Sequence, residues 1–318
     1  MNTRFSLVWW ATLALLALGS LLPEPSIELA RSVIVELFKL LPLILFVALM
    51  AGWLASSQLA DRVRNTLDSR PWHAIVFAGL IGAITPVCGI ASVPLVAALL
   101  RQGIPMAAAM AFWLSSPVTD PGMLILTAGI LGWPFAIGKL LAALLLGLVA
   151  GAVMQGLSCW KPQTHWVREG ALLQVSTNSC DSSAPSRFID EAKATFSMVV
   201  RWLAFALTLE AMVRAHLGET GFSILTTVDS AWAVPLAVAV GGPLYIEGYA
   251  ALPLLRGLID MGLTPGAAMA FLMSGATISL YSAIAVWSLV RPAIFGLYLT
   301  LGIVGALIAG WMTDLVML

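Results

Sequence analysis

The sequence predicts an all-α, polytopic membrane helix bundle of about 8–10 spans, made of two homologous halves with broken helices. Three observations lead to this fold class. Hydrophobic residues make up 60% of the 318 residues and charged residues only 10%, whereas about a quarter of a soluble domain is charged. The apolar residues fall into long charge-free runs, and one segment recurs 159 positions later. A soluble fold could not cover its surface with 16 basic and 16 acidic side chains.

The charge-free runs mark the candidate spans. A helix needs ~20 mostly apolar residues to cross the hydrocarbon core of a bilayer, and it satisfies its own backbone hydrogen bonds there. We therefore interpret most of these runs as spanning helices. The runs are 5–23, 40–60, 74–100, 102–119, 121–138, 140–160, 230–246, 261–290 and 292–313.

Four segments follow from this pattern. Residues 1–30 form an N-terminal span and loop, in which Arg4 precedes a long apolar run. Because they lack a clear small-x-small cleavage site, an uncleaved span is favoured over a signal peptide. Residues 31–156 form the first membrane repeat and 191–318 the second. The stretch 157–190 is rich in Ser, Asn, Asp and Pro, which predicts a polar linker.

The two repeats align without a gap. Residues 82–115 and 241–274 share 13 identities in 34 aligned positions. Glycines and prolines are among them, so a shared richness in Ala and Leu does not explain the match. We therefore predict a duplication. Matching pairs include Gly82/Gly241, Gly89/Gly248, Pro94/Pro253 and Ser115/Ser274.

The loops beside the repeats differ in charge. Residues 57–72 carry Arg62, Arg64 and Arg70, whereas the corresponding 216–231 carry no Lys or Arg. Basic loops stay on the cytoplasmic side of a membrane. The two loops are therefore expected on opposite sides, which predicts inverted repeats.

Both repeats contain Gly and Pro where a spanning helix would be interrupted. These positions lie in 85–89 and 115–122 of the first repeat and 241–248 of the second. Proline removes a backbone donor, and freed backbone groups at membrane depth persist only where they face protein or a wet cavity. A single Pro is explained by a helix kink, but matched breaks in paired halves are typical of secondary transporters, whose sites lie near the midplane.

Two motifs, at 85–95 and 116–121, resemble the signature of a known family. They read T-P-V-C-G-I-A-S-V-P-L and S-P-V-T-D-P, and they are similar to those of the predicted-permease family of organoarsenical efflux permeases (ArsP) and YraQ-like proteins. The resemblance covers roughly 30–310 and implies an inner-membrane efflux permease, some relatives of which export trivalent organoarsenicals or are linked to metal tolerance. Family members have Ser-Cys in place of Gly89-Ile90, and Asn in place of Asp120.

Two carboxylates are the leading candidates for proton coupling. Asp120 lies between two charge-free runs, and Glu247 ends another. Ionisable groups within a membrane segment are costly and are functional candidates by default. Glu247 aligns with Cys88 of the first repeat, and a carboxylate desolvated there would exchange a proton or bind a cation. The structural alternatives are a wet re-entrant tip for Asp120 and an ion pair with an Arg for Glu247.

Several other residues are candidates for the substrate pathway. Cys88 is either a small packing residue or a single soft ligand, and no metal site is assigned. Hydroxyls in the broken segments either contact the substrate or pack the helices closely. The full pathway set is Thr85, Pro86, Cys88, Ser115, Ser116, Thr119, Asp120, Tyr245, Glu247 and Ser274.

The function predicted from these features is a secondary transporter of the inner membrane that works by alternating access on a metal, a metalloid or another small solute. A passive channel and a non-transport assembly subunit remain as alternatives. An enzyme is not expected, because the sequence contains no G-x-x-x-x-G-K-[ST], H-E-x-x-H or G-x-S-x-G motif. The net charge of zero argues against nucleic acid as a partner. Membrane lipid is the expected surrounding, no cofactor is expected, and the oligomeric state is left open.

Overall fold

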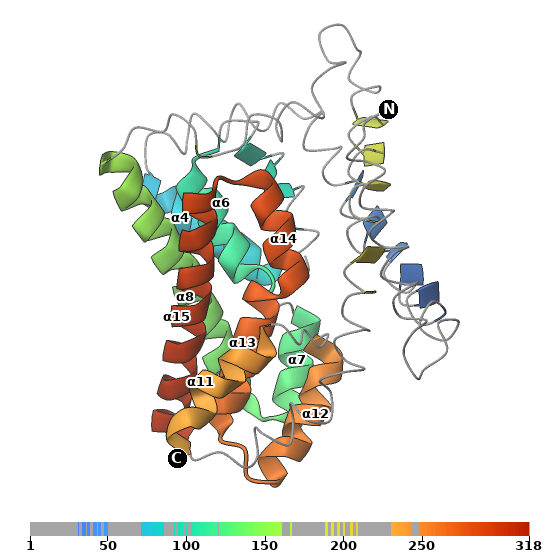
Figure 1. The fold of residues 1–318 in the computed structure, drawn as a ribbon, viewed down its shortest axis with the longest axis vertical. Coiled ribbons are helices and arrows are strands. Elements are labelled where there is room, and N and C mark those ends of the chain that lie inside the picture. Colours follow the sequence, from blue (N-terminus) through green and yellow to red (C-terminus); the bar gives the residue numbers. More distant parts are fainter. Residues whose placement is uncertain are drawn as a thin grey trace, which may run out of the picture. The chain divides into compact units, whose positions relative to one another are not determined.

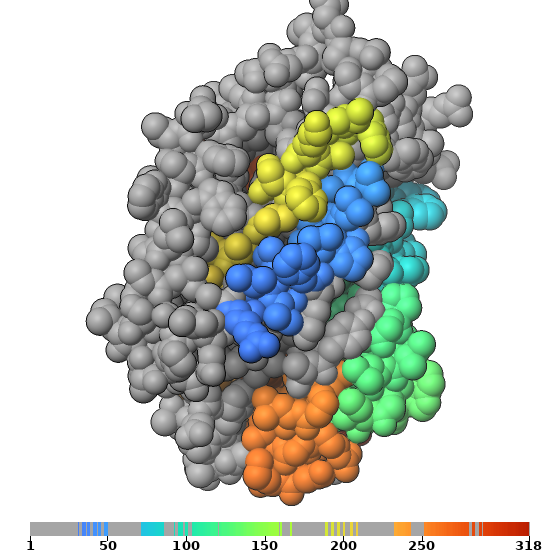
Figure 2. Space-filling view, turned by 90° about the vertical axis from the view of Figure 1, so that its right-hand side faces the viewer, coloured from blue at the N-terminus to red at the C-terminus, as the bar shows by residue number. Residues whose placement is uncertain are grey.

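The computed structural model describes residues 71–85, 104–119, 121–160, 230–242 and 248–317, with single residues in 31–49, 92–100 and 188–208 and residue 166. The chain forms two compact units. The smaller comprises Met1–Ser57 and Leu173–Gly218, and the larger comprises Gln58–Leu172 and Glu219–Leu318. Each unit therefore takes parts of both predicted repeats. Within the smaller unit, the described residues of 31–49 and 188–208 adjoin each other, in blue and yellow in Figure 2.

The larger unit is helical. Its described residues form nine helices and no strand, so the all-α prediction is confirmed for this part of the chain (Figure 1). The helices are α4 (Pro71–Ile84), α6 (Met106–Ser115), α7 (Pro121–Ile130), α8 (Trp133–Trp160), α11 (Ser230–Gly241), α12 (Gly248–Asp260), α13 (Pro265–Ile278), α14 (Leu280–Leu289) and α15 (Pro292–Met317). Helix α8 continues to Trp160, past residue 157, where the polar linker was expected to begin.

The offset of 159 residues recurs in the positions of the helices. Four helices of the first repeat begin 159 residues before four helices of the second. The pairs of first residues are Pro71 and Ser230, Met106 and Pro265, Pro121 and Leu280, and Trp133 and Pro292.

The packing between helices recurs as well. Helix α6 packs against α4 and α8, and its counterpart α13 packs against α11 and α15. The two groups meet through α8 and α15, and the contacts of α13 with α8 and of α6 with α15 are reciprocal. The helices of the two groups therefore share the same pattern of neighbours at the offset of 159 residues.

Close approach of α4 to α6 depends on a glycine, and the same holds for α11 and α13. A Cβ placed on Gly82 would contact the Ser115 hydroxyl and lie 2.9 Å from the Phe112 carbonyl oxygen. A Cβ on Gly241 would lie 2.8 Å from the Phe271 carbonyl oxygen and contact the equivalent serine hydroxyl. Because the obstructing atoms belong partly to the backbone, only glycine permits this spacing.

A second pair of glycines sets the position of the long helices. A Cβ on Gly151 of α8 would lie 2.5 Å from a methyl of Ile75 and 3.1 Å from the Ala107 carbonyl oxygen. A Cβ on Gly310 of α15 would lie 2.7 Å from a methyl of Val234 and 2.9 Å from another backbone oxygen. Small residues bring membrane helices together in this way.

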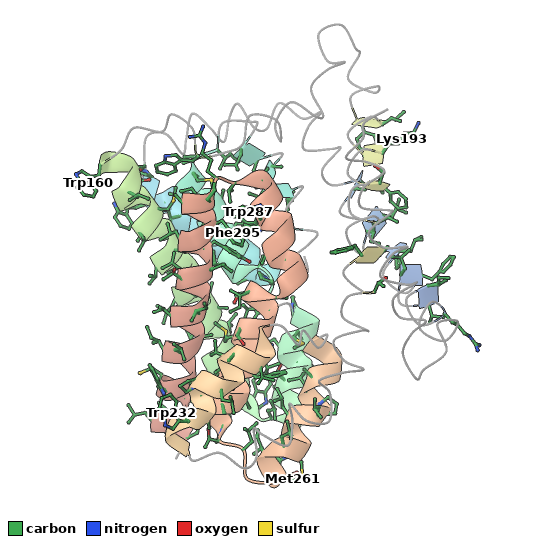
Figure 3. The ribbon with its side chains drawn as sticks, in the orientation of Figure 1. Trp160, Lys193, Trp232, Met261, Trp287 and Phe295 are labelled. Atoms are coloured by element: carbon green, nitrogen blue, oxygen red, sulfur yellow. The ribbon has the colours of Figure 1, made fainter. Side chains whose placement is uncertain are left out.

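In the part of the chain that the structure describes, two helices are long and apolar enough to span a membrane. They cover Trp133–Ser158 and Pro292–Met317. Large apolar side chains are exposed at every fourth position along α8, which in water would be an aggregation-prone stripe and in a bilayer faces lipid. Exposed tryptophans stand at opposite ends of the larger unit, Trp160 at one and Trp232 at the other (Figure 3), as in the aromatic belts of membrane proteins. The stripe on α8 comprises Trp133, Ile137, Leu141, Leu145, Val149 and Val153.

Two breaks between consecutive described helices lie inside this unit. Helices α6 and α7 are separated by 116–120, and α13 and α14 by Ser279. In Figure 1, α6 and α14 lie toward the upper end of the unit and α7 and α13 toward the lower end, so both interruptions fall between the two ends. Helix α12 of the second repeat packs on α7 of the first, and Figure 2 shows them side by side in orange and green.

Candidate functional site

Polar side chains gather where α4 ends and where α6 gives way to α7; we call this place the first break. Thr119 donates its hydroxyl to the carbonyl oxygen of Ala83 over 3.3 Å. Thr85 follows the end of α4, and both its amide and its hydroxyl donate to the Ile81 carbonyl oxygen. Ser116 and Thr119 are buried here. The first break is therefore anchored to the end of α4.

Ser115 and Ser274 occupy equivalent places in the two repeats, and both are fully buried. The Ser115 hydroxyl donates to the carbonyl oxygens of Ala111, at 2.9 Å, and Phe112, at 3.2 Å. The Ser274 hydroxyl donates to the Phe271 carbonyl oxygen at 3.1 Å. Since each proton is used within its own helix, these oxygens retain only acceptor capacity.

The interruption between α13 and α14, which we call the second break, is lined by further polar groups. Tyr298 of α15 donates its hydroxyl to the carbonyl oxygen of Thr277 and lies 3.4 Å from the hydroxyl of Ser282. Ser279 stands at the N-cap position of α14, but its side chain makes no capping hydrogen bond. All four residues are buried. Tyr298 thus caps the end of one helix and contacts the beginning of the next.

Trp113 reaches the second break from the first repeat. Its ring centroid lies 5.8 Å from that of Tyr298, with the planes tilted by 48°. Its Nε1 atom and the Ser279 Oγ atom are buried, and neither has a hydrogen-bond partner in the described part of the chain. Buried polar atoms are nearly always satisfied, so each of these two atoms is an exception that calls for an explanation.

Lys139 is a buried residue of α8 in the first repeat. It is 2% exposed and is the one charged side chain among the buried residues that the structure describes. Lys139 is the seventh residue of α8 and Tyr298 the seventh of α15, so they hold equivalent positions. Helix α8 packs on both α6 and α7. An ammonium group in the apolar interior of a spanning helix is costly and therefore a functional candidate.

The sequence did not lead us to several of these residues, although it contained a signal for some. Lys139 separates the charge-free runs 121–138 and 140–160, which is the usual mark of an intramembrane charge. At the offset of 159, Ser279 aligns with Asp120 and Tyr298 aligns with Lys139. Nothing in the sequence singles out Trp113, because its role depends on the contact with Tyr298.

Half of the predicted pathway residues can be placed. Thr85, Ser116 and Thr119 come together at the first break, with Ser115 beside them in α6. Ser274 lies at the equivalent place in α13. No group of three or more His, Cys, Asp or Glu residues that could hold a metal occurs among the described residues. The remaining predicted residues lie outside the described part of the chain: Pro86, Cys88, Asp120, Tyr245 and Glu247.

Comparisons with known proteins identify the family of this chain. Residues 26–315 match a family described as predicted permease. The UPF0718 protein YraQ of Escherichia coli (strain K12) is 27% identical over 70% of this chain and 63% of its own length. The UPF0718 protein YcgR of Bacillus subtilis (strain 168) is 25% identical over 37% of this chain and 41% of its own. A Streptococcus mutans protein, named as a two-component membrane permease complex subunit, is 25% identical over 44% of this chain and 47% of its own.

The matched regions cover less than two thirds of each of these relatives. No solved structure matches the chain. The family match nevertheless spans almost the whole sequence, and the apolar helices, with the exposed apolar stripe on α8, fit a multi-pass membrane protein. The resemblance seen in the two motifs is confirmed: this chain belongs to the predicted-permease family.

Proposed function

We propose that this permease is a secondary transporter of the inner membrane, which exports a small solute by alternating access and couples export to protons. The observation that carries the proposal is the pair of interrupted helices, together with a buried polar side chain at an equivalent position of each long helix that packs on them. Lys139 stands on α8 and Tyr298 on α15. Helix breaks lined by polar groups are how secondary transporters build a site at mid-depth.

Inverted repeats belong to this proposal. Their support is the direction of the two equivalent long helices. Helix α8 ends at Trp160 near the upper end of the view (Figure 3), whereas α15 ends close to the C-terminus at the lower end (Figure 1). Antiparallel equivalent helices are expected when the repeats are related by an axis in the membrane plane.

Proton coupling would use the acidic residues identified from the sequence. Asp120 aligns with Ser279, and Lys139 aligns with Tyr298. By this equivalence we infer that Lys139 compensates the charge of Asp120. The corresponding side chains that the structure describes at the second break are neutral hydroxyls. Removing one partner of a buried ion pair strongly destabilises the protein, because the other charge is left uncompensated. Protonation of Asp120 or Glu247 would therefore change the electrostatic balance at the site and release the substrate.

The candidate substrates are a metal ion, a metalloid or an organoarsenical. Cys88 would supply a single thiolate, and Thr85, Pro86, Ser116, Thr119 and Tyr245 would line the pathway. Soft species such as trivalent arsenic and Cu(I) prefer several thiolates. Ser115 and Ser274 would act mainly by keeping α6 and α13 close to their neighbours, because each packs against a glycine.

Flux measurements test the proposal. A strain that lacks the permease is first screened for altered tolerance to arsenite, trivalent methylarsenicals, Cu(I) and Zn(II). The purified protein is then reconstituted in liposomes, and transport of the solute that emerges from the screen is measured with and without an imposed proton gradient. We expect flux to depend on the gradient and to fall at least about tenfold in Asp120→Asn and Glu247→Gln. Wild-type flux in both variants would rule out the coupling role.

The same assay separates two alternatives. A passive channel would give flux that ignores the proton gradient and shows no exchange of labelled for unlabelled solute. An assembly subunit has one observation in its favour, because a relative is named as a subunit of a permease complex. It would give no flux alone, and the two carboxylates would be replaceable without loss of partner binding.

A further inference from the structure

We propose that the second break holds a subsite for an oxyanion, formed by what we call the donor cluster: Trp113, Ser279, Ser282 and Tyr298. The inference rests on the proposed function, because it assigns a ligand class to part of the same pathway. Its basis is the pair of buried polar atoms, Trp113 Nε1 and Ser279 Oγ, for which the described part of the chain offers no partner. Both residues are 1% exposed.

Two members of the donor cluster, Trp113 and Ser282, contact the side chain of Tyr298. Tyr298 contacts the Trp113 ring at a centroid distance of 5.8 Å, and its hydroxyl lies 3.4 Å from that of Ser282. It also donates to the carbonyl of Thr277, two residues before Ser279. Trp113 therefore brings an indole from the first repeat against the phenol that caps the end of α13.

The start of α14 adds backbone donors. The helix covers Leu280–Leu289, and its N-cap residue, Ser279, gives no side-chain hydrogen bond to the first turn. The first amides of any helix lack intrahelical acceptors, and they carry the positive end of the helix dipole. The backbone at this end of the break thus presents N–H groups, while Tyr298 already occupies the carbonyl of Thr277 at the other end.

The chemistry of these groups selects the sign of the ligand. The Trp113 indole is a donor only, because its Nε1 has no lone pair available for a cation. Together with the helix start, it favours a group with several acceptor oxygens and disfavours a bare metal cation. Hydroxyls such as Ser279 and Ser282 adapt to either role. An oxyanion offers several acceptor oxygens to the two open donors, Trp113 Nε1 and Ser279 Oγ, and charge-assisted hydrogen bonds are the strongest of their kind.

Equilibrium dialysis of the full chain in detergent tests the subsite directly. The probes are radiolabelled phosphate, sulfate and arsenate, measured against unlabelled competitor at constant ionic strength. We expect saturable binding of at least one of these anions, and no competition by zinc chloride. Trp113→Phe and Ser279→Ala should each weaken binding at least about tenfold, since each removes one hydrogen bond to a charged ligand.

Matched substitutions elsewhere serve as controls. Trp287→Phe removes an indole that packs edge-on against Phe295, at a centroid distance of 5.0 Å, on an exposed part of α14. Ser158→Ala removes a hydroxyl that bonds within the end of α8. Both controls should bind the anion as the wild type does. Thermal melts in detergent show whether each variant is folded, so that a loss of binding is not mistaken for a loss of structure.

Three outcomes would overturn the inference: no saturable binding of any of the three anions, equal binding in Trp113→Phe and the wild type, or an experimental structure in which ordered water alone satisfies Nε1 and Oγ. Failure of the transport proposal looks different. Anion binding that depends on the donor cluster without any flux in liposomes would contradict transport and leave the subsite standing. Proton-coupled flux that is unchanged in Trp113→Phe would contradict the subsite and leave transport standing.

Discussion

Trp113 and Tyr298 pack against each other with ring centroids 5.8 Å apart, and this contact joins the two repeats of the chain at an interrupted helix. Trp113 belongs to α6, and Tyr298 belongs to α15, the equivalent of α8. The aromatic pair therefore connects the second break to the opposite half of the chain. Movement of one repeat relative to the other would change the packing of these two rings. Substitutions at this contact therefore test both stability and transport.

The glycines at the ends of α4 and α11 should be intolerant of a methyl group. In Gly82→Ala and Gly241→Ala, the new Cβ would lie 2.9 Å and 2.8 Å from backbone carbonyl oxygens of α6 and α13. Overpacking of this kind costs ~1–3 kcal/mol, so we expect lower yield and a lower midpoint of thermal unfolding in detergent. Gly296→Ala is the control, because nothing lies within 4 Å of its Cβ position. Equal stability of all three variants would contradict the close helix contact.

Lys139 should be required for transport. In Lys139→Met the hydrophobic length of the side chain is kept but the ammonium is lost, which leaves any buried carboxylate at the first break uncompensated. We expect solute flux in liposomes to fall at least about tenfold. Lys193→Met, which changes an exposed lysine (Figure 3), should retain flux. If Lys139→Met transports normally, the buried charge serves no transport role.

The hydroxyl of Tyr298 should stabilise the second break. Tyr298→Phe keeps the ring contact with Trp113 but leaves the Thr277 carbonyl without its donor. An unsatisfied buried acceptor costs ~1–3 kcal/mol, which should lower the midpoint of thermal unfolding. Thr313→Val is the comparison, since that hydroxyl only donates to the Ala309 carbonyl within its own helix and its removal should be nearly neutral. Equal midpoints for Tyr298→Phe and Thr313→Val would argue against the helix-capping role.

Asp314 should stabilise the beginning of α13. Its carboxylate accepts from the Gly266 amide at 2.6 Å and from the Thr264 hydroxyl at 3.1 Å. Asp314→Asn keeps the shape but removes the charge that favours a helix N-terminus, at a cost of ~1 kcal/mol. Asp260→Asn breaks an exposed pair with Arg256 and should have a smaller effect, because exposed ion pairs contribute little. Chemical unfolding of the two variants side by side measures the difference.

The described helices lie where the sequence predicted them when composition and residue spacing determine their position. The charge-free run 140–160 lies within α8, and 292–313 lies within α15. The offset that relates 82–115 to 241–274 also relates the helix starts and the glycine contacts. These features can be predicted from the sequence alone, because the length of an apolar run determines whether a helix can span the membrane and a close helix approach requires glycine at fixed positions.

The candidate site was harder to predict. Hydroxyls such as Ser115 and Ser274 are conspicuous in the sequence, yet their protons are bonded within their own helices. Trp113 is one of 12 tryptophans, and only its packing against Tyr298 sets it apart. The role of a side chain at a site depends on the residues that it contacts. Contacts between residues far apart in the chain leave no recognisable pattern in the local sequence.

By itself, the sequence determined that this chain is an apolar, helical membrane protein with segments that recur at a fixed offset, because hydropathy, Gly and Pro act on the backbone locally. Only the tertiary structure decided which polar groups meet at the second break and that Lys139 is buried. The physical reason is that burial and hydrogen bonding depend on the neighbours that folding supplies. The equivalence of Lys139 and Tyr298 gained its meaning only once both were found buried on equivalent helices.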